Sequence, residues 1–234
     1  MLIVGTYFGD LPRFRPFAEQ WLQSVRRHAD GAQVRFISDR PGPLLGVECI
    51  ACSSEPFADC VRPRQSFDVK GALLCDALPR LPANEGVLMI DVDALLLASP
   101  WPLLAKFARC PMAMTTDHGA LLFVHSATLD GNWSHVLKQN SGVIWFGPSP
   151  RRREIPAMYR AAWHELQPVI PWTPKLTHLL EQYAWTLACH RLGVTILPPA
   201  LNWSTRLLGP CAEVVIDHDY GWGKWGAQPP PVNT

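Results

Sequence analysis

Two aspartates follow an apolar run in the stretch NEGVLMIDVDALLL, which covers residues 84–97. Asp91 and Asp93 come directly after Val87–Ile90, and apolar residues resume at Ala94, so both carboxylates are expected in a buried setting. An unpaired buried carboxylate is costly and needs a neutralising partner. A hard divalent cation that also bridges a diphosphate would supply the charge. Arginine pairing or helix capping would also explain a lone D-x-D, so this motif alone leaves both interpretations open.

Two later stretches carry polar residues beside apolar ones. KQNSGVIWF places Asn140, Ser141 and Gly142 immediately before an expected strand, where a ligand's hydroxyls could approach closely. A plain turn would have the same composition. LLEQYAW carries Glu181 and Gln182 inside an otherwise apolar helix. An acid so close to a buried stripe is either paired or functional.

Two further stretches lie near the carboxyl end. LPPALNWS contains Asn202, which could bond a hydroxyl, and Trp203, which could stack on a sugar or belong to the core. IDHDYGWGKW contains His218, whose imidazole is a borderline ligand for a manganese-like ion. Lys224 in the same stretch could reach a diphosphate as a point charge. Lys70 shares an expected helix face with apolar residues, and it either snorkels to the edge or meets an anionic ligand.

The elements that must position these residues follow from the hydrophobic pattern. Strands are expected at 2–8, 32–38, 46–51 and 86–90, with amphipathic helices after Pro12 and over 66–78. This alternation predicts an α/β fold with a mostly parallel mixed sheet flanked by helices. Ligands of such sheets bind at the carboxyl ends of the strands, where Asp91 stands. Beyond residue 98 we expect strands, some antiparallel at the sheet edge, at 111–116, 119–126 and 141–146, and a helix over 174–193.

Charge, apolar runs and cysteine spacing limit the classes of function that fit this chain. The chain has 234 residues, 21 basic and 20 acidic, so no bulk charge attracts nucleic acid or an anionic membrane. No apolar run approaches the roughly 20 residues that span a bilayer, and the first residues resemble a strand, so we expect a cytoplasmic protein. Seven scattered cysteines favour reduced thiols, and we expect a structural role for the Cys49–Cys52 pair. One domain over 1–226 and a disordered tail at 227–234 are expected.

The order of the motifs resembles a known family. Thr6 and Tyr7 end the first strand, and D-x-D, N-S-G-V, an acid–Gln pair, L-P-x-x-x-N and a late H-x-x-G-x-x-K follow in sequence. This series is similar to the retaining glycosyltransferases of family eight, the group of glycogenin and the bacterial lipopolysaccharide galactosyl- and glucosyltransferases. The likeness covers roughly residues 1–226, and the order and spacing together carry it. Two departures are Glu181, where the family has Asp, and Trp225, which follows Lys224 without a proline.

The resemblance implies a single GT-A (nucleotide-diphosphosugar transferase) domain that moves a hexose from a nucleotide-diphosphosugar, such as a UDP-sugar, to a glycan, lipid or protein acceptor with retention. It implies that Mn²⁺ (or Mg²⁺) is held by Asp91, Asp93 and His218. The residues expected to bind the nucleotide-sugar are Thr6, Tyr7, Lys70, Asp91, Ser141, Gly221 and Lys224. The expected catalytic residues are Asn140, Glu181 and Gln182. Residues expected at the sugar or acceptor are Asn202, Trp203 and Trp222.

Three other functions remain possible at this point. A phosphatase would use Asp91 as a nucleophile, but its D-x-D normally lies on the first strand. A nucleotidyltransferase would carry a glycine-rich basic loop after the first strand, whereas TYFGDLPRFRPF has one glycine and two arginines. A nucleotide-sugar or glycan binding protein without turnover would share most of the motifs.

Overall fold

The computed structural model describes residues 1–9, 11–63, 66–116, 139–168, 170, 179–193 and 195–218. Its strands are β1 (Leu2–Thr6), β2 (Gln33–Ser38), β3 (Cys49–Ala51), β4 (Val87–Ile90), β5 (Ala94–Leu96), β6 (Ala113–Thr116), β7 (Gln139–Phe146), β8 (Ile196–Leu197) and β9 (Ile216–His218). Its α-helices are α1 (Leu11–His28), α2 (Ser66–Ala77), α3 (Trp101–Leu104), α5 (Ile155–Leu166), α6 (Leu179–Arg191) and α7 (Thr205–Leu208). The 3₁₀-helices are η1 (Glu55–Cys60), η2 (Leu78–Arg80), η3 (Ala105–Phe107), η4 (Pro150–Glu154) and η5 (Pro199–Leu201).

Seven of these strands form one mixed sheet in the order β3-β2-β1-β4-β7-β6-β8. The strands β3, β2, β1 and β4 are parallel, β7 is antiparallel to both of its neighbours, and β8 is parallel to β6. The prediction of a mostly parallel mixed sheet is therefore confirmed. The antiparallel strand, however, lies inside the sheet and not at its edge. A second, two-stranded sheet pairs β5 with β9.

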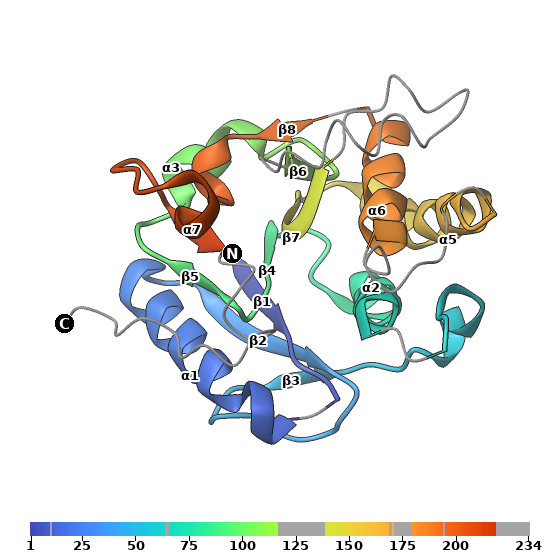
Figure 1. Cartoon of the computed structure of the whole chain (residues 1–234), viewed down its shortest axis with the longest axis horizontal. Coiled ribbons are helices and arrows are strands. Elements are labelled where there is room, and N and C mark those ends of the chain that lie inside the picture. Colours follow the sequence, from blue (N-terminus) through green and yellow to red (C-terminus); the bar gives the residue numbers. More distant parts are fainter. Residues whose placement is uncertain are drawn as a thin grey trace.

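Helices cover both faces of the sheet (Figure 1). Along β1, Leu2 and Val4 pack on one side with residues of α2, α5 and α6, while Ile3 packs on the other side with residues of α1. This alternation is the two-residue period of a strand buried on both faces. The predicted helix after Pro12 is confirmed as α1, and its Trp21 ring lies 5.1 Å from the ring of Phe36 on β2.

Helix α2 is buried on nearly all sides and not only on the predicted face. The helix lies against η1, α5 and α6 as well as the sheet. Two of its charged residues, Asp68 and Lys70, are therefore buried as well. Asp68 is satisfied by Arg62, whose Nε and Nη2 donate to the two carboxylate oxygens at 2.7 and 2.9 Å. Lys70 has different partners, which lie at the candidate site described below.

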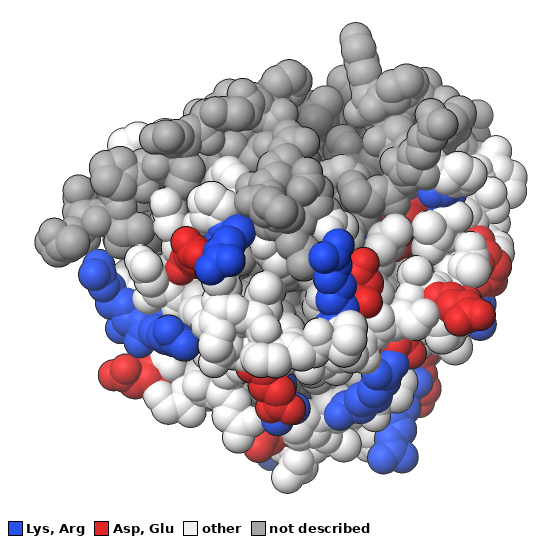
Figure 2. All heavy atoms as spheres, turned by 90° about the horizontal axis from the view of Figure 1, so that it is seen from below, with Lys and Arg blue, Asp and Glu red and all other residues white. Residues whose placement is uncertain are grey.

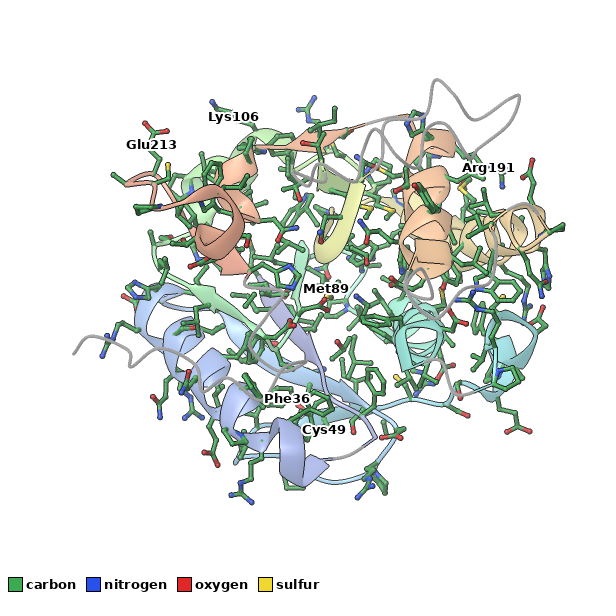
Figure 3. The ribbon with its side chains drawn as sticks, viewed as in Figure 1. Phe36, Cys49, Met89, Lys106, Arg191 and Glu213 are labelled. Carbon is green, nitrogen blue, oxygen red and sulfur yellow. The ribbon has the colours of Figure 1, made fainter. Side chains whose placement is uncertain are left out.

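Figure 3 shows how the interior and the periphery of the molecule differ. Met89 of β4 lies near the middle and is fully buried, whereas Lys106, Arg191 and Glu213 lie at the periphery. Phe36 and Cys49 are partners in the β2–β3 register and lie close together in the same figure. On the face shown in Figure 2, basic and acidic side chains of the described residues are intermixed, without a broad patch of one sign.

All seven cysteines are free, as expected from their scattered spacing. Burial raises the pKa of Cys52 to about 11, so its thiol stays protonated at neutral pH and is a poor nucleophile. The described helices include none that is long and apolar enough to cross a bilayer.

Some expectations need correction or lie outside the described residues. Strand β7 begins at Gln139, two residues before the expected start at 141, so Asn140 belongs to the strand instead of preceding it. Helix α6 is confirmed from Leu179 onward. The expected strand at 119–126, the start of the expected helix at 174 and the tail at 227–234 fall outside the described residues. The single-domain boundary at residue 226 therefore stays a prediction.

Candidate metal and donor site

The antiparallel pairing of β4 with β7 brings two distant segments to one edge of the sheet. Ile90, the last residue of β4, is paired with Val143, so the first residues of β7 lie beside Asp91. The Asp91 amide donates to the Gly142 carbonyl oxygen at 2.8 Å. Opposite this point the register of β7 with β6 shifts, which bends the strand at the site. Asn140 and Ser141 consequently point to the same region as Asp91.

A tight turn, and not an extended backbone, connects the two aspartates. The Ala94 amide donates to the Asp91 carbonyl oxygen at 3.0 Å, so the backbone reverses direction between these two residues. Directly after the turn, β5 pairs with β9, and Ala94 lies opposite His218. Nε2 of His218 lies 3.2 Å from Asp93 Oδ1 and 4.0 Å from Asp91 Oδ2. Possible ligand atoms of all three residues lie within 4.8 Å of one another.

Lys70 connects this group to helix α6. Its Nζ lies 3.1 Å from Asp91 Oδ2 and 3.6 Å from Glu181 Oε1, and it also donates to the Ser141 carbonyl oxygen at 3.4 Å. The Ser141 hydroxyl donates to Glu181 Oε2 at 2.8 Å. Of the two outcomes expected for Lys70, the structure excludes snorkelling, because the side chain is buried and bridges two carboxylates.

Burial and neighbouring charges shift the pKa values of these groups. Burial raises the pKa of Glu181 to about 7, although the Lys70 ammonium and the Ser141 hydroxyl oppose this. Burial raises the pKa of Asp91 as well, against the attraction of Lys70. For Lys70, burial lowers the pKa, but Asp91 and Glu181 outweigh it and the net pKa is raised. The pKa of His218 is also raised, because Asp93 and Asp91 outweigh the effect of burial.

The His218 ring is tightly enclosed. Its Nδ1 lies 3.0 Å from Asn202 Oδ1, and Asn202 Nδ2 donates to Thr115 Oγ1 at 2.9 Å. On another side the ring lies against Gly142, where an added Cβ would stand 2.1 Å from His218 Cε1. Such a distance is far below van der Waals contact, so this position of the ring requires glycine at 142.

Eight of the predicted site residues line one pocket. Two more lining residues were not predicted as ligand contacts: Phe67 on α2, and Gly142, which the sequence marked only as small. The full lining is Phe67, Lys70, Asp91, Asp93, Asn140, Ser141, Gly142, Glu181, Gln182 and His218. Within it, Gln182 Nε2 donates to the Gln139 carbonyl oxygen at 2.9 Å, which anchors α6 to β7.

Other predicted residues do not reach the pocket. Thr6 and Tyr7 are buried at the end of β1, and the Tyr7 ring packs 6.0 Å from that of Phe36. Asn202 lies behind His218 and not at the pocket wall. Trp203 is half-buried, and its Nε1 donates to the Gly209 carbonyl oxygen at 2.9 Å. Gly221, Trp222 and Lys224 lie outside the described residues.

No sequence pattern pointed to Thr115. A threonine in a strand is ordinary, and only the packing of β6 against the Asn202 segment makes its hydroxyl a partner of the site. Gly142, in contrast, could have been ranked higher, because a glycine within a strand marks close approach by another group.

The residues present fit a divalent cation. Two carboxylates and one imidazole form a mixed oxygen and nitrogen set, which suits a hard to borderline ion such as Mn²⁺ or Mg²⁺. With Asp91, Asp93 and Glu181 ionised and His218 neutral, Lys70 leaves two negative charges unbalanced. One divalent cation would neutralise them.

Comparisons with known proteins support a fold assignment. Neither a protein-family profile nor a curated protein sequence matches the chain. A structure of the galactosyltransferase LgtC in complex with donor and acceptor sugar analogs matches with a TM-score of 0.68 and 16% identity, covering 94% of this chain and 87% of that one. The chain has a glycosyltransferase fold of the GT-A type. This agrees with the fold that the order of the motifs implied.

Two further structures agree with this fold. An active-site mutant of LgtC matches with a TM-score of 0.65 and 15% identity, covering 94% of this chain and 88% of that one. The apo form of mouse xyloside xylosyltransferase 1 matches with a TM-score of 0.61 and 12% identity, covering 93% of this chain and 97% of that one.

Proposed function

We propose that this protein is a metal-dependent glycosyltransferase that moves a hexose from a nucleotide-diphosphosugar, most simply a UDP-sugar, to a glycan, lipid or protein acceptor. One observation carries the proposal. Asp91, Asp93 and His218 converge at the carboxyl edge of a GT-A sheet, beside Lys70 and the polar residues of β7 and α6. The LgtC structure with donor and acceptor sugar analogs supports a nucleotide-sugar donor for this fold.

The reaction breaks the bond between the anomeric carbon and the diphosphate oxygen and forms a bond from that carbon to the acceptor oxygen. The acceptor proton passes to the departing phosphate oxygen. A divalent cation, when bound by Asp91, Asp93 and His218, supplies Lewis-acid stabilisation of charge that grows on the leaving diphosphate. Lys70, fixed between two carboxylates, adds a positive charge at the same edge without reorganisation.

The residues of β7 and α6 are placed to hold the sugar. Asn140, Glu181 and Gln182 line the pocket from these two elements and are bonded to neighbouring groups that restrict their rotamers. Carbonyl or carboxylate oxygens near the anomeric carbon stabilise oxocarbenium-like character. We propose retention of configuration from the resemblance to family eight, and the anomeric coupling constant of the product in NMR spectra tests it.

The proposal is tested by incubating the purified protein with UDP-galactose and UDP-glucose, and with the pentose donor UDP-xylose for comparison, in the presence of Mn²⁺ and measuring released UDP. We expect release from one donor, faster with its acceptor, and loss of release after chelation of the metal. Calorimetric binding of a donor without release would instead indicate a binding protein. Phosphate release from simple phosphate esters, lost in Asp91→Asn, would indicate a phosphatase. The expected cytoplasmic location stays a prediction.

A further inference from the structure

Asn202 lies behind the pocket wall, and its side chain is hydrogen-bonded to one lining residue, His218. Its side chain is buried, and its amide group bridges two partners. Oδ1 lies 3.0 Å from His218 Nδ1, and Nδ2 donates to Thr115 Oγ1 at 2.9 Å. A side chain engaged at both amide atoms is poorly placed to bond a sugar hydroxyl, which was the role expected from the sequence.

The geometry has a chemical consequence for the imidazole. An amide oxygen only accepts hydrogen bonds, so its partner His218 Nδ1 must carry a proton. Nε2 is then the nitrogen that can present a lone pair, and it is the one directed at Asp93 and Asp91. A hydrogen bond at the second ring nitrogen commonly selects the tautomer and the ring orientation of a metal-ligating histidine.

The backbone keeps Asn202 in register with His218. The Trp203 amide donates to the Ile216 carbonyl oxygen at 2.9 Å, and the His218 amide donates to the Trp203 carbonyl oxygen at 2.5 Å. These bonds tie the segment after η5 to β9, so the side chains of Asn202 and His218 cannot shift independently. Gly142 closes another side of the ring.

We propose that Asn202 is a positioning residue, which holds a proton on His218 Nδ1 so that Nε2 faces the cation bound by Asp91 and Asp93. Thr115 supports this role because its hydroxyl oxygen accepts from Asn202 Nδ2 while the amide oxygen faces His218. This inference rests on the proposed function in one respect, because it requires that Asp91, Asp93 and His218 bind a divalent cation.

The test measures Mn²⁺ binding directly, with no need for turnover. Free Mn²⁺ is titrated by electron paramagnetic resonance against the full chain, with and without UDP, for the wild type, Asn202→Leu and Asn202→Asp. Leucine is close in size but has no acceptor, whereas aspartate keeps an oxygen for the Nδ1 proton. We expect Asn202→Leu to weaken Mn²⁺ binding about 10- to 100-fold, and Asn202→Asp to bind within a few-fold of the wild type.

A spectroscopic readout distinguishes a loss of imidazole coordination to Mn²⁺ from a general loss of packing around the site. Spin-echo modulation from a directly coordinated imidazole nitrogen should be present in wild type and Asn202→Asp and reduced in Asn202→Leu at saturating Mn²⁺. Thr115→Val should weaken binding less than Asn202→Leu, because the amide oxygen remains. Circular dichroism melts of each variant check folding.

The outcomes distinguish this inference from the proposed function. Wild type that binds Mn²⁺ with nitrogen modulation, together with an unchanged Asn202→Leu, overturns the role of Asn202 and leaves the glycosyltransferase proposal intact. Equal losses in Asn202→Leu and Asn202→Asp would also overturn it, since the retained acceptor then gives no rescue. A wild type that binds no Mn²⁺ with or without UDP overturns the metal site itself, and the inference with it.

Discussion

Within the part of the chain that the structure describes, two groups of possible metal ligands lie close together, and they differ in their exposure and in their charged neighbours. One is Asp91, Asp93 and His218, and the other is Asp59, Cys60 and His164. In the second group Asp59 is exposed and is bonded to His164 at 2.7 Å and to the Arg160 guanidinium at 3.1 Å. Arg160 also lies 4.5 Å from the centre of the Phe57 ring.

In the second group the carboxylate of Asp59 is already paired with a positive charge. The Arg160 guanidinium supplies a positive charge to the carboxylate, and burial raises the pKa of Cys60 to about 12, so its thiol carries no negative charge at neutral pH without a metal. In the first group Asp91 and Asp93 lie close to a third acid, Glu181, and among the described residues Lys70 is the one lysine or arginine paired with them. Distances between ligand atoms therefore do not define a cation site by themselves, and the local charge balance decides.

The comparison is tested most strongly by paired substitutions, one in each group. Asp93→Asn should reduce UDP release about 10²–10³-fold and abolish the stabilisation by Mn²⁺ in thermal melts, because it removes an anionic ligand. Asp59→Asn should keep both responses. A Mn²⁺ shift that survives Asp93→Asn and disappears in Asp59→Asn would show that the cation binds at the other group.

Gly142→Ala should displace the His218 ring without changing a charged residue. It therefore tests whether cation binding at the first group depends on the position of this ring. The added Cβ would lie 2.1 Å from His218 Cε1, so the ring or β7 must move. We expect about 1–3 kcal/mol lower stability in urea melts and about 10–100-fold weaker Mn²⁺ binding by electron paramagnetic resonance. Unchanged Mn²⁺ affinity would mean that His218 is not required for the cation.

Glu181→Gln tests whether the buried acids cost stability when no cation is added. The folded pKa of Glu181 is about 7, above its ordinary value, so this carboxyl binds its proton more tightly in the folded state. Its contribution to stability is fully present at low pH and is lost as the pH rises through about 7. The variant should remove up to about 3 kcal/mol of this pH dependence. An identical pH profile in both proteins, measured by urea melts between pH 4.5 and 8, would contradict this.

Asp59→Asn should have the smallest effect on stability, less than about 1 kcal/mol at pH 7, because its ion pairs are exposed to solvent. The hydrogen bond from His164, together with Arg160, lowers the pKa of Asp59. Its contribution is therefore present above the unfolded pKa and fades as the pH falls through the lower folded value. A loss of several kcal/mol in chemical melts would mean that this group matters for the fold.

Local patterns predicted the amino-terminal half well. The spacing of Phe17, Trp21 and Val25 indicated the buried face of α1, and the apolar run before Asp91 indicated β4, because these signals depend on a few neighbouring residues. The all-round burial of α2 could not be predicted in the same way. It depends on η1, α5 and α6 packing around the helix.

The sequence predicted several residues of the site but not how they are arranged in space. The types and order of Asp91, Asp93 and His218 pointed to a cation site, but no local pattern indicated the turn that follows Asp91. The contacts of Asn202 were not predicted either. Its amide meets Thr115 and His218, residues 87 and 16 positions away in the chain, and spacing alone carries no information about such a contact.

The sequence by itself determined the alternating elements of the sheet and the inventory of carboxylates, imidazole and lysine that could do chemistry. Only the tertiary structure decided which of them meet. The pairing of β5 with β9 sets His218 opposite Ala94, and the antiparallel β7 sets Asn140 and Ser141 beside Asp91. The physical reason is that propensity and periodicity act over a few residues, whereas the energy of bringing charges together depends on distances that the folded sheet alone fixes.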